Sequence, residues 1–194
     1  DVSGGYAYVA DGSSLRIVDI STPTSPQLLS SVPGSSGDVV VAGNYAYVVG
    51  TGRLAIVDVT SPSSPSTVLN SSGDFLDLAI SGTRMYVSMR DMQPYNPITA
   101  YDVTSPSTPH SLGSIVTPGF PHDFAASGNS VYVAETGALR VVDFTVPGSA
   151  VIVGSVSTPG VARSVALLGQ YACVACGAAM LVVDVSVPSA PAIV

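Results

Sequence analysis

The sequence contains no lysine and no tryptophan, and its cations apart from two histidines are six arginines. Thirteen acidic residues leave a formal net charge of -7. A surface that binds nucleic acid needs basic side chains to neutralise phosphates, so this charge balance excludes nucleic acid as a partner. The same acidity disfavours an anionic membrane surface. No apolar run reaches the roughly 18–20 residues that span a bilayer, so we expect no membrane span.

Charged residues are scarce, at 10% of the 194 residues, whereas apolar residues reach 46%. This content is sufficient for a sizeable core and argues against disorder. The chain begins at Asp1 with neither Met nor a signal-like segment, as a mature or trimmed form would. Richness in Ser, Thr, Gly and Pro without Lys suits a secreted or cell-surface protein. Asn70-Ser71-Ser72 is an acceptor pattern for N-glycosylation.

One stretch recurs through the chain. It reads LRIVDISTPTSP at Leu15–Pro26, and its close copies are Leu54–Pro65, Ile98–Pro109, Leu139–Ala150 and Met180–Pro191. Each copy holds one aspartate, and these are spaced by 39, 44, 41 and 41 residues: Asp19, Asp58, Asp102, Asp143 and Asp184. Periods of this length are typical of units that cannot bury their own faces and must stack.

Each repeat reads as four short strands, because Gly or Pro interrupts most candidate helices and no 3.6-residue pattern persists. Small residues in the first strand fit a crowded position near a central axis. Apolar pairs in the third, such as Val141-Val142, are typical of a strand covered on both faces. We therefore expect an all-β fold, a five-bladed β-propeller of four-stranded antiparallel blades. It would form a single domain over residues 1–194, with blades at about 1–34, 35–73, 74–118, 119–160 and 161–194.

The recurring aspartate at the end of the third strand has a structural explanation. Its carboxylate can accept backbone N–H bonds in the turn that follows. Proline four residues later fixes φ and prevents the strand from continuing. We therefore assign these five aspartates to the turns.

The segment YAYVADGSSLRIVDISTPTSP, residues 6–26, resembles the LVIVD repeat family. This is a bacterial and archaeal β-propeller repeat that is often found in exported and surface proteins. The resemblance covers all five repeats, and it implies a propeller and an extracellular location but no single activity. Three positions depart from the pattern: Asp1–Gly5 is short for an inner strand, Ala150 replaces a turn proline, and Cys173 replaces a tyrosine. Because of the first departure, the sequence does not decide whether the five blades close into a ring.

The third repeat is interrupted by a longer loop, Ser88–Pro97, between its second and third strands. In a propeller this loop lies on the same face as the loop entering the next blade, Thr117–Asp123. A concave mouth with converging polar groups is the usual form of a binding site. We therefore predict a ligand site whose candidate residues are Arg90, Asp91, Tyr95, Asn96, Phe120, His122 and Asp123. The alternative is a loop that lengthened without a function.

Three aspartates occupy equivalent positions at the start of the first strand, namely Asp38, Asp77 and Asp123. Three carboxylates around an axis could hold calcium, which takes about six to eight oxygen ligands. Two of them could act as a glycosidase pair, which needs carboxyl groups about 5–10 Å apart. The third alternative is structural, because a carboxylate at a strand start satisfies backbone N–H groups. We expect no other cofactor.

The remaining motifs give no catalytic residues. Cys173-Val-Ala-Cys176 has a redox spacing, but it lies on a strand, where the two side chains point to opposite faces. Redox pairs usually sit at a helix N-terminus, which lowers the thiol pKa. The sequence has no G-x-S-x-G element to place a nucleophile against His122.

We therefore predict an extracellular or surface module for binding or scaffolding, with its ligand mouth beside blades three and four. The ligand would be a glycan, a peptide or a protein, and the oligomeric state is left open. One alternative is a glycoside-active enzyme that uses the axial carboxylates. The other is a purely structural repeat segment of a larger surface protein.

Overall fold

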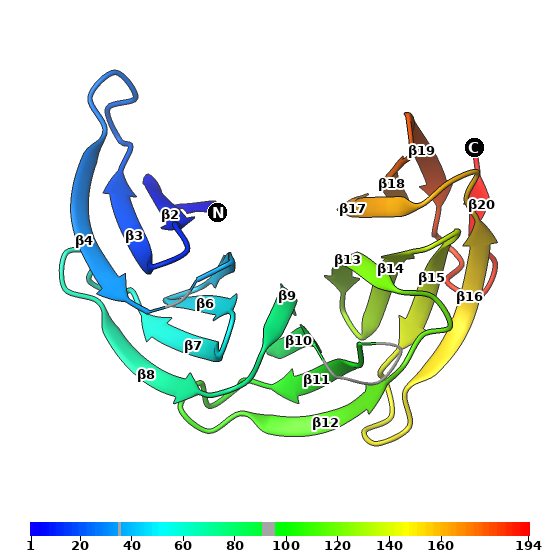
Figure 1. Cartoon of the computed structure of the whole chain (residues 1–194), viewed down its shortest axis with the longest axis horizontal. Helices are drawn as coiled ribbons and strands as arrows, with labels where there is room; N and C mark the ends of the chain where they lie inside the picture. The colour runs from blue at the N-terminus through cyan, green and yellow to red at the C-terminus, as the bar shows by residue number, and fades with distance from the viewer. Residues whose placement is uncertain (35, 91–95) are drawn as a thin grey trace.

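A computed structural model describes residues 1–34, 36–90 and 96–194. These residues form five four-stranded antiparallel sheets, one for each repeat. Figure 1 shows the sheets standing side by side around a common axis. The predicted all-β fold with five four-stranded blades is confirmed, and each sheet lies within one of the residue ranges expected for a blade. Within the described part of the chain, no helix has the length and apolarity needed to cross a bilayer.

Each blade runs outward from the axis in chain order. The innermost strands are β1 (Val2–Ser3), β5 (Asp38–Ala42), β9 (Phe75–Ser81), β13 (Pro121–Ser127) and β17 (Ala162–Leu168). The second strands are β2 (Tyr6–Ala10), β6 (Tyr45–Gly50), β10 (Arg84–Met89), β14 (Ser130–Glu135) and β18 (Tyr171–Cys176). The third strands are β3 (Ser14–Asp19), β7 (Arg53–Asp58), β11 (Ile98–Asp102), β15 (Ala138–Asp143) and β19 (Ala179–Asp184). The outer strands are β4 (Gln27–Pro33), β8 (Ser66–Ser71), β12 (His110–Ile115), β16 (Val151–Ser157) and β20 (Ala192–Ile193).

The hydrophobic core lies between the blades rather than inside them. Its four clusters of buried residues fall one at each junction of neighbouring blades. At the junction of blades four and five, for example, Leu139 of β15 packs in one cluster with Val174 of β18. Neighbouring third-strand residues such as Val141 and Val142 are both fully buried, because an internal blade is covered on both faces.

The recurring aspartates act in the turns, as the sequence predicted. Each accepts a hydrogen bond of 2.7–2.9 Å from the backbone N–H two residues later: Asp19 from Ser21, Asp58 from Thr60, Asp102 from Thr104, Asp143 from Thr145 and Asp184 from Ser186. Hydrogen bonds from that Ser or Thr, through its side chain and its backbone, hold the carboxyl pKa below its usual range in four cases: Asp19, Asp58, Asp102 and Asp184.

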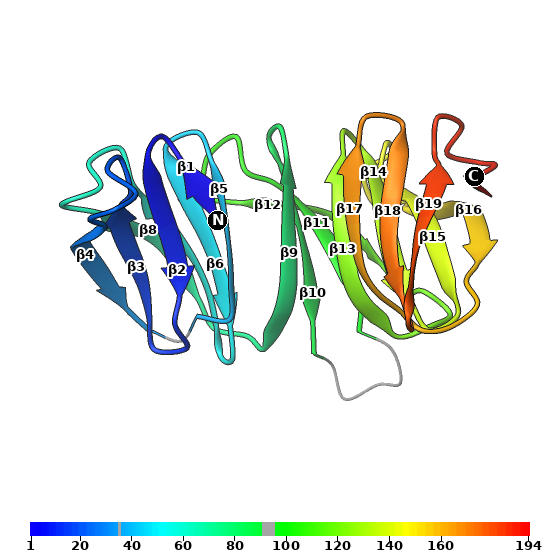
Figure 2. The same cartoon turned by 90° about the horizontal axis from the view of Figure 1, so that it is seen from above.

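The five blades form an open arc. Figure 1 shows blade one, which holds the N-terminus, and blade five at opposite ends of this arc, and Figure 2 shows the same separation from above. The terminal strands β1 and β20 contain only two residues each. The short inner strand that the sequence indicated for blade one is therefore present, and the described blades do not close on one another.

Candidate functional site

A cavity of about 830 Å³ opens where the inner strands of blades three, four and five begin. Residues proposed from the sequence line it, namely Arg90, Asn96, Phe120, His122, Asp123 and Asp77. The other polar lining residues are Ser88, Arg163 and Ser164. The cavity is therefore lined by Ser88 of β10, by Arg90 and Asn96 of blade three, and by the starts of β9, β13 and β17.

The structure brings together five of the seven residues predicted to bind a ligand, because they all line this one cavity. The other two, Asp91 and Tyr95, lie outside the described residues. The ligand-binding role of all seven stays a prediction. Sequence reasoning missed Arg163 and Ser164, which occupy the blade-five positions matching His122 and Asp123. The one signal that the sequence offered was Ser164 itself, which stands where the equivalent positions of blades two, three and four hold an aspartate.

A buried acid supports the wall that blade four contributes. The side chain of Glu135, at the end of β14, is fully buried and pairs with Arg140 of β15. Its Oε2 accepts a 3.1 Å hydrogen bond from the backbone N–H of Gly119. A Cβ at Gly119 would lie 2.8 Å from Cδ of Glu135, so the loop can approach this acid only as glycine. This contact fixes the backbone immediately before Phe120.

Two rings extend from this wall into the cavity. The ring centroids of Phe120 and His122 are 5.2 Å apart and tilted by 54°. Nε2 of His122 lies 3.3 Å from Oγ1 of Thr136 in the adjacent turn. Phe120 keeps 43% of its surface exposed. The site therefore presents an apolar face that no described residue covers.

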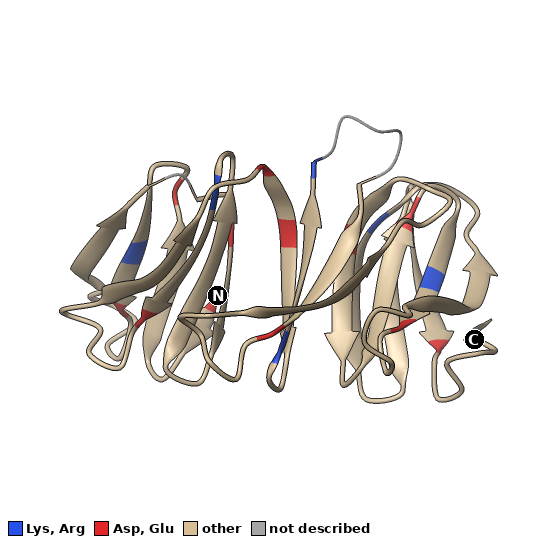
Figure 3. Cartoon of the chain, turned by 90° about the horizontal axis from the view of Figure 1, so that it is seen from below, with Lys and Arg blue, Asp and Glu red and all other residues tan. Residues whose placement is uncertain are grey.

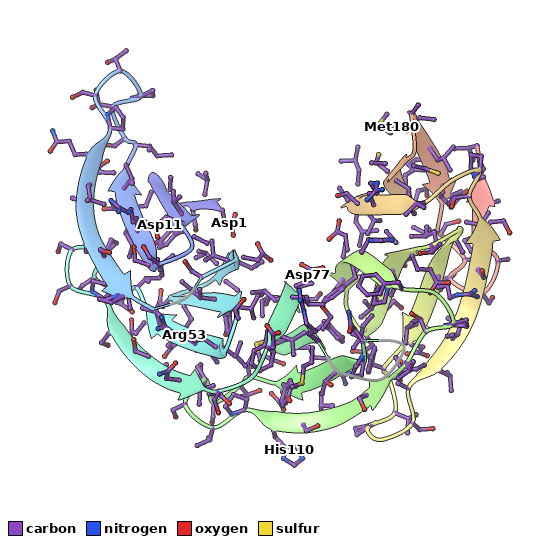
Figure 4. The ribbon with its side chains drawn as sticks, in the orientation of Figure 1. Asp1, Asp11, Arg53, Asp77, His110 and Met180 are labelled. Carbon is purple, nitrogen blue, oxygen red and sulfur yellow. The ribbon has the colours of Figure 1, made fainter. Side chains whose placement is uncertain are left out.

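The axial carboxylates join neighbouring blades. Asp77 of blade three accepts a 2.9 Å bond from the N–H of Leu78 and a 3.1 Å bond from the N–H of Phe124 in blade four. Asp123 in turn accepts 2.7 Å bonds from the N–H of Val165 and from Oγ of Ser164 in blade five. Figure 4 shows Asp77 on the inner side of the arc. These contacts support the structural alternative for both residues.

Burial, together with the nearby charges of Asp123 and Asp38, raises the pKa of Asp77 to about 8. The two backbone N–H donors oppose this shift but do not cancel it. Asp77 is therefore largely protonated at neutral pH.

No group of three or more His, Cys, Asp or Glu in the described part of the chain is arranged to hold a metal ion. Asp38 accepts a 2.8 Å bond from the N–H of Val39. A calcium site formed by Asp38, Asp77 and Asp123 stays a prediction. Cys173 and Cys176 are both free thiols, and Cys176 is buried.

Two arginines whose side chains donate no hydrogen bond to another described residue, Arg90 and Arg163, both line the cavity. Figure 3 shows charged residues scattered along the whole arc. Four of the six arginines donate hydrogen bonds within blades or across junctions: Arg16 to Asp11, Arg53 to Asn70 and Pro33, Arg84 to Phe144, and Arg140 to Glu135 and Ser155. Arg90 has a 3.5 Å ion pair with Asp74 and a side chain that is 66% exposed. Arg163 makes no hydrogen bond or ion pair with another described residue, so both guanidiniums have donors available.

The amide of Asn96 is a further donor at this site. Asn96 is 4% exposed, and its Nδ2 has no hydrogen-bond partner among the residues that the structure describes. A buried donor without an acceptor costs about 1–3 kcal/mol. Because Asn96 also lines the cavity, a bound acceptor group could satisfy this donor.

Several solved structures share the fold. A functionally unknown protein from Desulfotomaculum acetoxidans superimposes with a TM-score of 0.81 at 13% identity, over 100% of this chain and 67% of its own. BamB from Moraxella catarrhalis superimposes with a TM-score of 0.69 at 15% identity, over 91% of this chain and 53% of its own. The N-terminal domain of Nup159 superimposes with a TM-score of 0.62 at 12% identity, over 97% of this chain and 57% of its own. This chain therefore spans between about half and two thirds of these three structures.

The repeats also match a known family by sequence. No curated protein matches the chain. The LVIVD repeat matches four segments, residues 1–32, 33–71, 118–158 and 159–194. The unmatched segment holds blade three, the blade with the longer loop. Because the four matches cover most of the sequence, the chain belongs to the LVIVD repeat family.

Proposed function

We propose that this protein is a binding module whose cavity takes an acidic saccharide. The observation that carries the proposal is the convergence of Arg90, Asn96 and Arg163 on one cavity beside the exposed ring of Phe120. The three polar side chains are donors, and no hydrogen bond fixes either guanidinium among the described residues. A ligand rich in acceptors and carrying a carboxylate would complement them.

The chemistry of each group fits this ligand class. A guanidinium pairs with a carboxylate through charge-assisted and often bidentate hydrogen bonds. The buried amide of Asn96 would donate to a ring hydroxyl or carboxylate oxygen. The face of Phe120 offers apolar surface to the C–H groups of a sugar ring, as in binding sites that combine apolar walls with a few polar groups.

The protonation state of Asp77 also supports an anionic ligand. An ionised carboxylate on the cavity floor would repel it. Because the pKa of Asp77 is raised to about 8, this side chain is mainly neutral at pH 7. Oδ2 of Asp123 accepts the hydrogen bonds from Ser164 and Val165 of blade five. The cations at the mouth are therefore opposed by less negative charge than the number of aspartates suggests.

An array of uronic-acid oligosaccharides, neutral saccharides and acidic peptides tests the proposal. We expect the wild type to bind a uronate. By calorimetry, Arg163→Gln should weaken that binding about tenfold or more, since a hydrogen bond to a charged group contributes about 1.5–3 kcal/mol. Phe120→Ala should also weaken it, because it removes the apolar face offered to the sugar ring. The matched control is Arg16→Gln, which removes a half-exposed arginine from blade one, away from the cavity.

The outcomes separate the ligand class from the site. Uronate binding that is equally unaffected by all three substitutions would contradict the cavity as the site. Binding of acidic peptides alone, lost in the cavity variants, would keep the site and reject the saccharide. No binding to any array component would reject the binding function and favour a structural role.

A location outside the cytoplasm belongs to the same proposal. The lysine-free composition and the acceptor triplet at Asn70 support it. Ser72 of this triplet is exposed, and Asn70 lies on the outer strand β8, where a glycan could be accommodated. Fractionation of the native host, with immunodetection of the protein in the medium, envelope and cytoplasm, tests the location. Confinement to the cytoplasm would reject it.

One observation favours a second candidate, a glycoside-active enzyme. Asp77 is a buried carboxyl whose raised pKa suits a general acid, and the charge of Asp123 contributes to that shift, so the two carboxyls lie near enough to be considered as a glycosidase pair. Against this candidate, both oxygens of Asp77 already accept backbone bonds. Hydrolysis of the bound oligosaccharide, abolished by Asp77→Asn, would establish it. A product-free incubation of the wild type would exclude it for that ligand.

A further inference from the structure

The two arginines that line the cavity come from the blades on either side of blade four. Arg90 follows β10 of blade three, and Arg163 is the second residue of β17 in blade five. Figure 1 shows blade four, with β13 to β16, standing between these two blades. The two cations of the cavity are therefore supplied by blades that are not neighbours.

Arg90 is held on the blade-three side of the cavity. Its backbone N–H donates a 2.7 Å hydrogen bond to the carbonyl of Asp74, and its Nε lies 3.5 Å from Oδ2 of the same residue. Asp74 immediately precedes β9, so both contacts tie Arg90 to the entry of the inner strand of its own blade. The Arg90 side chain is nevertheless 66% exposed, which leaves donors of its guanidinium available to a ligand.

The same side of the cavity holds the amide of Asn96. Its Nδ2 is buried and has no hydrogen-bond partner among the described residues. Buried donors are nearly always paired with an acceptor, so an unpaired one in a cavity wall indicates a ligand oxygen. Arg90 and Asn96 therefore form one set of donors, which belongs to blade three.

Arg163 supplies a second set of donors on blade five. Oδ2 of Asp123 accepts hydrogen bonds from Oγ of Ser164 and from the N–H of Val165, the two residues that follow Arg163. These bonds fix the backbone at the start of β17. Arg163 itself is exposed, and its guanidinium makes no hydrogen bond or ion pair with another described residue. Its position is therefore fixed, whereas its donors are available.

The wall between the two sets of donors belongs to blade four. It carries the rings of Phe120 and His122, and Phe120 is 43% exposed. The cavity volume of about 830 Å³ lies in the upper part of the range of ligand pockets, which is roughly 300–1,000 Å³. The cavity therefore has room for several linked sugar units, with an apolar surface in the middle and cations on both sides.

We propose, building on the function proposed above, that the ligand is an oligosaccharide with carboxylates on at least two different sugar units. One carboxylate pairs with Arg90 on blade three, and another pairs with Arg163 on blade five. The sugar between them lies against Phe120. Each carboxylate can then accept charge-assisted, bidentate hydrogen bonds from its own guanidinium. A ligand with a single carboxylate would leave one of the two guanidiniums without an anionic partner.

Calorimetry with three linear trisaccharides of the same linkage tests this pairing. One trisaccharide carries a carboxylate on every unit, and the other two carry it only on the reducing or only on the non-reducing unit. We expect the wild type to bind the fully acidic form about tenfold or more tightly than either single-acid form, because each single-acid form makes one charged pair fewer. Arg90→Gln should weaken one single-acid form about tenfold and leave the other unchanged, and Arg163→Gln should do the reverse.

The matched control is Arg16→Gln in blade one, which should leave the affinity for all three trisaccharides unchanged. The melting temperature of each variant should stay at the wild-type value, because these arginines are solvent-exposed and exposed ion pairs contribute little to stability. A loss of affinity without a change in melting temperature then reports on the contact with the ligand rather than on folding.

Two results would overturn the pairing of two carboxylates with two arginines. Equal affinity of the wild type for the fully acidic and single-acid trisaccharides would show that one carboxylate is enough. Equal losses from both arginine substitutions with the same single-acid form would show that the arginines share one carboxylate. In either case the cavity would still bind a uronate, so the function proposed above would stand. No binding of any of the three would reject that function and the pairing together.

Discussion

The aspartates show how one residue type acquires different roles from its surroundings. The turn aspartates are partly exposed and accept hydrogen bonds, which hold their pKa values low, as at Asp19 and Asp58. Asp77 also accepts two backbone bonds, but burial and two neighbouring carboxylates raise its pKa to about 8. Desolvation therefore outweighs hydrogen bonding at the axis, whereas hydrogen bonding dominates at the surface.

Asp77 makes stability depend on pH in a defined direction. Its unfolded pKa is about 4, and its folded pKa is about 8. Between these values the native state binds more protons than the unfolded state, so the free energy of unfolding falls as pH rises. Asp77→Asn should cost about 1–3 kcal/mol at pH 5, because one backbone N–H loses its acceptor. The cost should shrink by pH 8.5, as measured by urea unfolding at both values.

The control for this prediction is Asp19→Asn. The pKa of Asp19 is lowered, so its contribution to stability is lost only below about pH 4. Its free energy of unfolding should therefore run parallel to the wild type from pH 5 to 8.5. A parallel course for Asp77→Asn as well would show that Asp77 does not titrate in this window.

At the scale of elements, the loop before β13 carries the cavity wall. The equivalent loops of blades four and five share the sequence Thr-Pro-Gly, with Gly119 and Gly160 at matching positions. In both loops the threonine hydroxyl donates to the glycine carbonyl, at 3.1 and 2.6 Å. They differ in what faces the glycine, which is Glu135 in blade four and Cys176 in blade five.

This difference predicts opposite outcomes for the same substitution. In Gly119→Ala the new Cβ would lie 2.8 Å from Glu135, so we expect a loss of about 1–3 kcal/mol in the free energy of unfolding and weaker ligand binding. In Gly160→Ala the Cβ would meet Sγ of Cys176 at an ordinary 3.6 Å, so stability should stay within about 1 kcal/mol of the wild type. Equal effects in urea unfolding would contradict the role of Glu135.

The elements of the site were only partly predictable from the sequence. The longer loop of blade three interrupts the repeat, and that interruption pointed to Arg90 and Asn96. The contribution of blade five to the cavity could not be predicted from the sequence, because Arg163 and Ser164 stand in a regular repeat. They line the cavity only because of their position around the axis. The support from Glu135 depends on a hydrogen bond to Gly119 between two elements, which no local pattern encodes.

At the scale of the molecule, the repeat predicts the blades but not their closure. Apolar pairs, small inner residues and turn aspartates repeat in each unit and dictate one sheet apiece, so the strands follow from local pattern. Closure depends on how far each blade is rotated from the previous one, which is set by packing between blades. The structure shows an arc with exposed apolar ends at Val9 and Met180.

The whole chain also sets the conditions for binding. A formal net charge of -7 repels an anionic ligand at long range, and only the local arginines oppose this repulsion. We therefore expect higher salt to screen both effects, so that affinity changes little between about 50 and 200 mM salt. Calorimetry across this range checks the balance. A steep loss of affinity would indicate more cationic contacts than Arg90 and Arg163 supply.

The most direct test of the binding function is hydrogen–deuterium exchange with and without the uronate oligosaccharide that binds best. The cavity predicts slower exchange at residues 117–124 and 162–165, the starts of β13 and β17. It predicts no change in the outer strands β4, β8, β12 and β16, which lie far from the axis. Protection confined to the outer strands or to blade one, at saturating ligand, would contradict the site.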